Sequence, residues 1–276
     1  MAQRNIRKME RGVSTVDGAG VHLVRVLGRD TARDFDPFLM LDSFDSTNPE
    51  DYIKGFPLHP HRGIETITYL IDGTIEHADS LGNKGTIRSG QSQWMTAGSG
   101  ILHQEMPKPH PHMLGLQLWL NLPSDEKMTA PKYFDINEDM VGVAHENGAT
   151  VRVISGDYKN TKGVKPPHIP ATLYDVSLEP EHKITLDTKS DETVFVFLIK
   201  GDGIVAGKPI AEKTAVLLGD GDEVTLEATN NSEMRFIFGM AKPLGESIAW
   251  GGPIVMNTRK ELDQAFSELE QGTFIK

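Results

Sequence analysis

Short apolar runs separated by turn residues constrain the fold of this chain more than any other feature. Runs rich in valine, isoleucine, threonine and phenylalanine alternate with glycine, aspartate and asparagine through most of the 276 residues. Clear examples are ETITYLI at 65–71, GLQLWLNL at 115–122 and TVFVFLI at 193–199. Asp72-Gly73 and Gly201 follow two of these runs, and such residues are typical of hairpin turns. The pattern predicts an all-β protein, a sandwich or barrel built from many short strands.

An internal repeat indicates two domains. Residues Glu65–Gly73 read like residues Glu192–Gly201 once one inserted residue is allowed. Each copy continues through a glycine-rich hairpin, so the repeat predicts a duplicated β-barrel. A length of 276 residues also suits two domains. We place the boundary in the polar stretch 137–149, which predicts an N-terminal domain of residues 1–140 and a C-terminal domain of residues 141–276.

A single convincing helix is expected near the C-terminus. Thr258 and Glu261 have the spacing of a capping box, in which each side chain bonds the backbone of the other residue. The residues that follow at helical spacing and form an apolar stripe are Leu262, Ala265, Phe266 and Leu269. This stripe must pack against another part of the protein, but the sequence leaves open which domain the tail covers.

Charge and composition exclude several classes of function. A net charge of -11 repels phosphate and anionic lipid, so direct nucleic-acid binding is not expected. We interpret the basic segment Arg4–Arg11 as a solvated leading segment, because it contains Glu10 and lacks aromatic residues for base stacking. With no cysteine, disulfides, thiolate catalysis and Cys-ligated metals are excluded. The absence of an apolar stretch of signal-peptide or membrane-spanning length predicts a cytoplasmic protein without membrane contact.

Two pairs of potential metal ligands stand on alternate residues. In an extended segment His59-Pro60-His61 projects both imidazoles from the same face, and His103-Gln104-Glu105 repeats the arrangement after the glycine-rich approach 97–100. Two such strands facing each other inside a barrel would supply three nitrogens and one carboxylate. One such pair alone is common on exposed strand ends, but two matched pairs favour a metal site.

The ligand set suits a borderline divalent metal. Fe(II), Mn, Co, Ni, Cu and Zn all accept imidazole and carboxylate ligands. Four protein ligands leave open positions on a six-coordinate ion for water, a substrate or dioxygen. The residues alone do not choose among these metals.

These ligand motifs and several other segments resemble those of a known family, the pirins. The segments that carry the resemblance are HPHRGIET at 59–66, QWMTAGSGILHQEMP at 93–107, GLQLWLNL at 115–122, FLMLDSF at 38–44 and GPIVMNT at 252–258. Pirins are bicupins, with two double-stranded β-helix barrels, and the N-terminal barrel binds iron. The resemblance implies Fe(II) held by His59, His61, His103 and Glu105. The broader cupin pattern also matches Glu65, which is therefore a rival fourth ligand or a residue that supports the ligands.

The resemblance implies two alternative functions. Some pirins are quercetin 2,3-dioxygenases, which suggests a metal-dependent oxidoreductase that acts on a small aromatic substrate with dioxygen. Glu105 and Glu65 are then the candidate catalytic bases. The family also includes non-catalytic, iron-binding regulators that interact with transcription or metabolic proteins. Sequence features do not separate the two, although an occluded barrel mouth would favour the regulator.

The second barrel is not expected to bind a metal. Aligning Glu192 with Glu65 puts Leu186 and Thr188 where the first two histidines stand. Neither leucine nor threonine offers a side-chain nitrogen or carboxylate that could replace these histidines as a metal ligand. We interpret the second barrel as a structural or regulatory copy.

Several other residues are less decisive. His110-Pro111-His112 copies the first motif but lies in a proline-rich connection, which indicates a surface loop. His77 lies in a predicted hairpin and either overhangs the barrel mouth or sits at a solvated tip. The large apolar side chains of Trp94, Met95 and Trp119 are interpreted as core, with a substrate pocket as the alternative. Gln117 and Asn121 share the strand face opposite Leu116 and Leu118, but periodicity does not say which face is inside.

Overall fold

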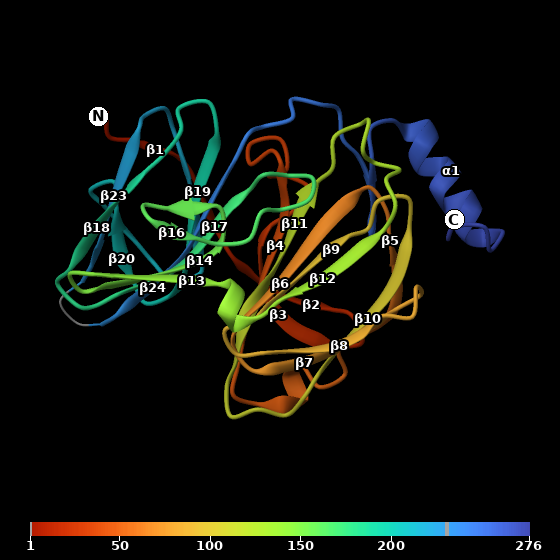
Figure 1. Cartoon of the computed structure of the whole chain (residues 1–276), viewed down its shortest axis with the longest axis horizontal. Helices are drawn as coiled ribbons and strands as arrows, with labels where there is room; N and C mark the ends of the chain where they lie inside the picture. The colour runs from red at the N-terminus through yellow and green to blue at the C-terminus, as the bar shows by residue number, and fades with distance from the viewer. Residues whose placement is uncertain (1, 230–231) are drawn as a thin grey trace. The chain divides into compact units, whose positions relative to one another are not determined.

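A computed structural model describes residues 2–229 and 232–276, which form two compact units (Figure 1). The N-terminal unit comprises Ser14–Arg29, Phe38–Asn137 and Leu244–Lys276. The C-terminal unit comprises residues 2–13, Asp30–Pro37 and Glu138–Pro243. A single boundary between residues 140 and 141 therefore does not describe the two units. Residues 2–13 belong to the C-terminal unit, and residues 244–276 belong to the N-terminal unit.

The N-terminal unit is built from two antiparallel sheets. The larger has seven strands in the order β12-β9-β6-β11-β4-β3-β2, and the smaller has four in the order β5-β10-β7-β8. The bounds of the larger sheet's strands are β12 Lys132–Ile136, β9 Ser92–Thr96, β6 Ile64–Asp72, β11 Met113–Asn121, β4 Phe38–Ser46, β3 Val21–Leu27 and β2 Val13–Asp17. Those of the smaller are β5 Phe56–His61, β10 Ile101–Pro107, β7 Thr74–Asp79 and β8 Lys84–Arg88. Leu70 of the larger sheet and Ile75 of the smaller belong to one buried apolar cluster, so the two sheets share a core.

The C-terminal unit repeats this topology. Its seven-stranded sheet has the order β1-β22-β19-β24-β17-β14-β13, and its four-stranded sheet has the order β18-β23-β20-β21. The bounds of the first are β1 Ile6–Arg11, β22 Thr214–Leu218, β19 Thr193–Lys200, β24 Met234–Ala241, β17 Thr172–Leu178, β14 Ala149–Ser155 and β13 Gly142–Glu146. The bounds of the second are β18 Lys183–Asp187, β23 Glu223–Ala228, β20 Gly203–Val205 and β21 Lys208–Ile210. The two repeat segments form β6 and β19, which occupy the same place in their sheets, so the predicted all-β duplication is confirmed.

The remaining elements are short except for the C-terminal helix. They are the 3-10 turns η1 Pro49–Asp51 and η2 Glu138–Met140, the strand pairs β15 Asp157–Tyr158 with β16 Thr161–Lys162 and β25 Ala249–Gly251 with β26 Ile254–Met256, and helix α1 Arg259–Glu270. Within the described residues, the helices are too short to cross a membrane.

Helix α1 confirms the predicted capping box. The Thr258 hydroxyl accepts from the Glu261 backbone N–H, and the Glu261 carboxylate accepts from the Thr258 N–H. Leu262 and Ala265 are buried in a cluster with the β25–β26 hairpin, whereas Phe266 of the predicted stripe stays 37% exposed. The tail that the sequence left unassigned therefore packs in the N-terminal unit, where its blue ribbon lies with the orange and yellow strands (Figure 1).

The prediction of a solvated leading segment was wrong. Strand β1 pairs with β22 of the C-terminal unit, and its residues alternate between half-buried and exposed. Arg4 is only 3% exposed, and its guanidinium donates to the Thr188 hydroxyl at 2.7 Å and to the Gly219 carbonyl at 2.6 Å. Backbone pairing and these acceptors offset the cost of burying the charge, which composition alone does not reveal.

Candidate metal centre

The two predicted ligand pairs lie on neighbouring strands of the smaller sheet. β5 and β10 pair antiparallel, with His59 opposite His103. The two ligand pairs thus come from adjacent strands of one sheet. The register shifts between His103 and Glu105, so Glu105 stands opposite Phe56 rather than continuing the regular pairing. Adjacent strands bring cross-strand side chains within contact distance, which gathers the histidines more closely than opposite walls would.

Three imidazoles form one cluster. Ligand atoms of His59, His61 and His103 all lie within 4.8 Å of one another. The ring centroids of His103 are 4.4 Å from His59 and 4.9 Å from His61. His61 and His103 are buried, while His59 is half-buried. Such a cluster, open on one side, is the arrangement that a transition-metal site needs.

The orientation of two rings fits a bound cation. Nδ1 of His59 lies 2.8 Å from the Pro57 carbonyl oxygen, and Nδ1 of His61 lies 3.1 Å from the Pro253 carbonyl oxygen. A carbonyl only accepts, so both Nδ1 atoms carry a proton, and the Nε2 atom of a ring that is neutral presents a lone pair. These Nε2 atoms are 3.0 Å apart. A proton shared between them or a metal ion bound to both accounts for that separation, because nitrogens bonded at about 2.1 Å to one metal ion lie at this spacing.

Burial keeps His61 and His103 in the neutral form that metal binding requires. Burial, followed by the charge of His59, lowers the pKa of His61 to about 3. Burial, followed by the neighbouring His61 and His59, holds the pKa of His103 well below its usual value. Neither ring nitrogen of His103 has a hydrogen-bond partner among the described residues. A neutral, buried imidazole without a partner is costly unless a metal takes its lone pair.

The two candidate carboxylates have different surroundings. Glu105 is buried on β10, the strand that also carries His103. Its carboxylate accepts hydrogen bonds from the Thr68 hydroxyl and from the Gln117 amide, both at 2.7 Å. Glu65 is also buried and accepts from the Thr96 hydroxyl at 2.8 Å. The three-histidine cluster within the described residues includes neither of them.

A cavity of about 560 Å³ opens onto the cluster. His59 and His61 form part of its wall, and Gln117, which bonds Glu105, forms another part. Three aromatic side chains line it, namely Phe56, Trp119 and Trp250. The volume falls in the usual range for a small-molecule site, about 300–1,000 Å³.

The aromatic wall of the cavity contacts the histidine cluster. The Trp119 ring meets His61 edge-on, with centroids 4.9 Å apart, and lies 6.0 Å from the Trp250 ring. Trp94 and Met95, by contrast, are fully buried core residues. The core interpretation is therefore confirmed for those two, and Trp119 belongs to the cavity.

An ion-pair network forms the polar side of the cavity. The Arg25 guanidinium binds the Asp42 carboxylate through two nitrogens, at 2.9 and 2.8 Å, and reaches Asp17 at 2.7 Å. Burial raises the pKa of Asp42 even though Arg25 opposes the shift. The exposed side chain of Arg29 adds a second cation to the same lining.

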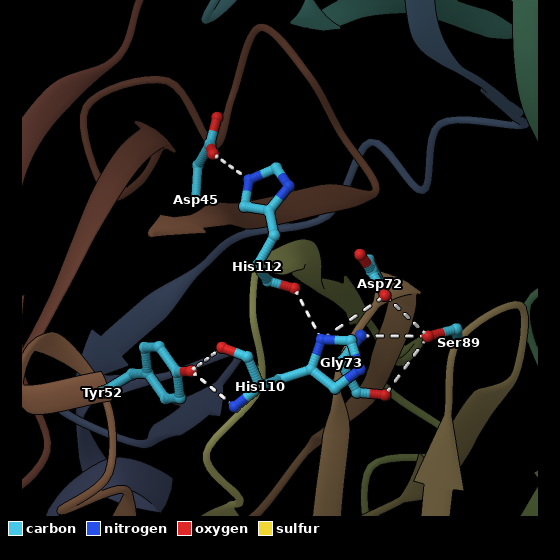
Figure 2. Close-up of polar contacts among 7 residues, drawn as sticks. All are labelled: Asp45, Tyr52, Asp72, Gly73, Ser89, His110 and His112. Carbon is cyan, nitrogen blue, oxygen red and sulfur yellow. Dashed lines mark hydrogen bonds and ion pairs between the residues drawn. The ribbon is translucent and has the colours of Figure 1, made fainter. Parts of the chain in front are cut away.

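The second H-P-H motif does not join the cluster. His110 and His112 lie in the loop between β10 and β11, which confirms the predicted surface loop. Figure 2 shows that each imidazole approaches an aspartate: His112 Nε2 lies 2.8 Å from Asp45, and His110 Nδ1 lies 3.5 Å from Asp72. The loop is further held by the Tyr52 hydroxyl, which bonds the His110 backbone.

His77 is not at a solvated hairpin tip. It is 4% exposed on β7, with Nδ1 against the Tyr133 hydroxyl and Nε2 3.3 Å from Asp135. Its strand pairs with β10, and its partner there is Glu105. The polar neighbours explain how a histidine in a short polar hairpin comes to be buried.

The C-terminal unit carries apolar side chains where the N-terminal unit carries histidines. β18 and β23 occupy the places of β5 and β10, and Leu186 pairs with Val224 as His59 pairs with His103. Leu186 and Val224 belong to the buried core of that unit. Thr188 is instead bonded by Arg4.

Sequence reasoning missed the contribution of the tail to this site. Trp250, Gly252 and Pro253 line the cavity although they follow His61 by about 190 residues. The family-like segment 252–258 was a signal that this stretch matters, but nothing local connects it with the histidines. The burial of the basic side chains Arg62 and Lys127 was also missed, since both read as ordinary surface residues.

Comparison with known proteins aligns most of the chain with one family. A family model described as "Pirin" matches residues 20–120, and one described as "Pirin C-terminal cupin domain" matches residues 173–275. A pirin-like protein of Caulobacter vibrioides is 41% identical over 278 residues, covering 99% of this chain and 100% of that protein. A crystal structure of quercetin 2,3-dioxygenase from Acinetobacter baumannii matches with a TM-score of 0.92 at 33% identity, covering 99% of both chains. A bacterial pirin from Escherichia coli, whose structure is a complex with nickel(II), has the same fold at 22% identity, with a TM-score of 0.64 over 86% of this chain and 98% of that one.

Proposed function

The chain belongs to the pirin family, with two cupin domains, and from that premise we propose that it is a metal-dependent dioxygenase acting on a flavonol such as quercetin. The observation that carries the proposal is the cavity of about 560 Å³, which reaches the histidine cluster and has aromatic walls. An occluded site would favour a non-catalytic, iron-binding regulator instead. The matching structure named quercetin 2,3-dioxygenase supports the proposed substrate class.

Iron is the proposed resident metal, held by His59, His61 and His103 with Glu105 as the fourth ligand. Three imidazoles whose ligand atoms lie within 4.8 Å of one another support the first three assignments. The Thr68 and Gln117 hydrogen bonds would orient the Glu105 carboxylate. Manganese, cobalt, nickel, copper and zinc suit the same donors, and the nickel complex of the Escherichia coli pirin makes nickel the first alternative to test.

The protein's own residues would bind and prepare the substrate. When bound, a redox-active metal supplies the Lewis-acid and electron-transfer chemistry that allows an electron-rich flavonol to react with dioxygen. Trp119, Trp250 and Phe56 form flat apolar walls for the aromatic rings. Glu105 or Glu65 would accept the proton of the substrate's hydroxyl, because a general base must lie within hydrogen-bond reach of that group. In the overall reaction both oxygen atoms enter the opened product, and one ring carbon leaves as carbon monoxide.

Oxygen-dependent turnover tests the proposal. Protein with a verified metal content should consume quercetin in air, release carbon monoxide and do neither without oxygen. Metal-free protein is the control, and His61→Ala should lose metal and turnover together. If metal-loaded protein shows no oxygen-dependent loss of flavonol above that control, the regulator becomes the better account.

A further inference from the structure

Arg62 is a buried cation next to the histidine cluster. It follows His61 directly and is only 2% exposed. A guanidinium removed from water is tolerated only when several acceptors surround it. Because Arg62 lies between His61 of the cluster and Gly63, the groups that accept its hydrogen bonds also help to hold the cluster in place.

The Arg62 guanidinium joins two parts of the N-terminal unit. Nε donates to the Ser99 carbonyl at 2.7 Å, and Ser99 lies in the turn that leads into β10 and His103. Nη2 donates to the Phe274 carbonyl at 2.8 Å and lies 2.8 Å from the Glu268 carboxylate. The guanidinium carbon also stacks 4.1 Å from the centre of the Phe274 ring. One side chain thus touches the approach to the second histidine strand and the end of the chain.

The backbone behind the cluster is tied to the same tail. The Val255 N–H donates to the Arg62 carbonyl at 3.1 Å, next to the bond between the Pro253 carbonyl and His61 Nδ1. Buried Lys127 donates to the carbonyls of Gly63 and Val255, at 2.8 and 2.9 Å. Gly63 itself has a φ of 77°, and an added Cβ would collide with the Val255 carbonyl oxygen.

We propose that Arg62 is a positioning residue for the metal centre, resting on the metal binding proposed above. By fastening residues 253–274 behind β5, it keeps the Pro253 carbonyl at His61 Nδ1 and thereby fixes the His61 tautomer and ring orientation. Through Ser99 it also fixes the approach to His103. Partners of this kind, outside the ligand set, typically change metal affinity by about 10- to 100-fold when removed.

The test compares metal retention in full-length variants. Arg62→Met keeps much of the aliphatic stem and removes all donors, whereas Arg62→Lys keeps the charge and part of the hydrogen bonding. Arg235→Met is the control, because Arg235 forms a bidentate pair with buried Asp175 in the C-terminal unit and so also loses a buried ionic contact. Each protein is loaded with Co(II), and both its visible absorption spectrum and the rate of metal transfer to a chelator are measured.

Arg62→Met should release Co(II) about tenfold faster than wild type and show an altered visible spectrum. Arg62→Lys should recover part of the difference, and Arg235→Met should match wild type. A folded Arg62→Met protein with wild-type release and spectrum would overturn the proposal. Should that variant fail to fold, Glu268→Gln and Phe274→Ala are measured instead, and wild-type behaviour in both would overturn it equally. Wild-type protein that binds no Co(II) would contradict the metal site itself, which is a different failure.

Discussion

Nδ1 of His61 lies 3.1 Å from the carbonyl oxygen of Pro253, a residue 192 positions later in the chain. This contact directs the other ring nitrogen toward His59 and His103. A histidine near the start of the chain is therefore oriented by a backbone group close to its end.

One metal ion per chain is expected, bound through His61. His61→Ala should reduce the bound metal to near zero, because it removes one of the two buried imidazoles of the cluster. His112→Ala is the matched control, as it changes the second H-P-H motif, whose imidazole pairs with Asp45 on the surface. Elemental analysis of extensively dialysed protein measures both. Two ions per chain in the wild type would mean that the C-terminal unit also binds a metal.

Glu105 should matter more for metal retention than Glu65. Glu105→Gln replaces a negatively charged metal ligand near His103 with a neutral amide, and it should weaken metal binding about 10- to 100-fold. Glu65→Gln should leave binding near wild type and act on turnover instead. Competition with a metal chelator ranks the two, with flavonol turnover measured in parallel. The reverse order would assign the fourth position to Glu65.

Trp250 should contribute to substrate affinity. Trp250→Ala removes one aromatic wall of the cavity and should weaken flavonol binding by about 1 kcal/mol, or roughly fivefold in Kd. Phe266→Ala is the control, since Phe266 is an exposed aromatic residue of α1 outside the cavity lining. Fluorescence titration under anaerobic conditions measures binding without turnover. Equal affinities for the two variants would exclude Trp250 from the binding surface.

Lys127 should make stability depend on pH in the alkaline range. Burial lowers the pKa of Lys127 to about 7 from 10.5. Between pH 7 and pH 10.5, Lys127 is protonated in the unfolded chain but has lost its proton in the folded protein. The free energy of unfolding therefore rises with pH in this range. The slope is at most about 1.4 kcal/mol per pH unit. Lys127→Met should lack this contribution, and urea unfolding of both proteins at several pH values in this window measures it. Parallel stability curves would show that Lys127 titrates normally.

Local patterns predicted the elements well because their causes are local. The run at 65–71 lies within β6, and Thr258 with Glu261 begins α1 as the capping box requires. The alternation of His59 and His61 likewise brought both imidazoles to one cluster. In each case the period of a strand or the geometry of a helix terminus decides the outcome.

The remainder depends on contacts between distant segments. The pairing of His59 with His103 on adjacent strands is a matter of sheet order, which strand periodicity does not encode. Arg4, Arg62 and Lys127 read as surface residues, and only the carbonyl oxygens that surround them in the folded protein make their burial possible. The aromatic wall at Trp250 is supplied by the tail, whose docking site the sequence left open.

The exchange of terminal segments between the units also sets an order of events during synthesis. The cluster histidines are made early, but the N-terminal unit includes residues 244–276, which are made last. At about 5–20 residues per second, the intervening stretch occupies the ribosome for on the order of ten seconds. During that interval His61 has no Pro253 carbonyl to orient it and Arg62 has no tail to hold. His61 therefore reaches its final geometry only after the segment that contains Pro253 has left the ribosome.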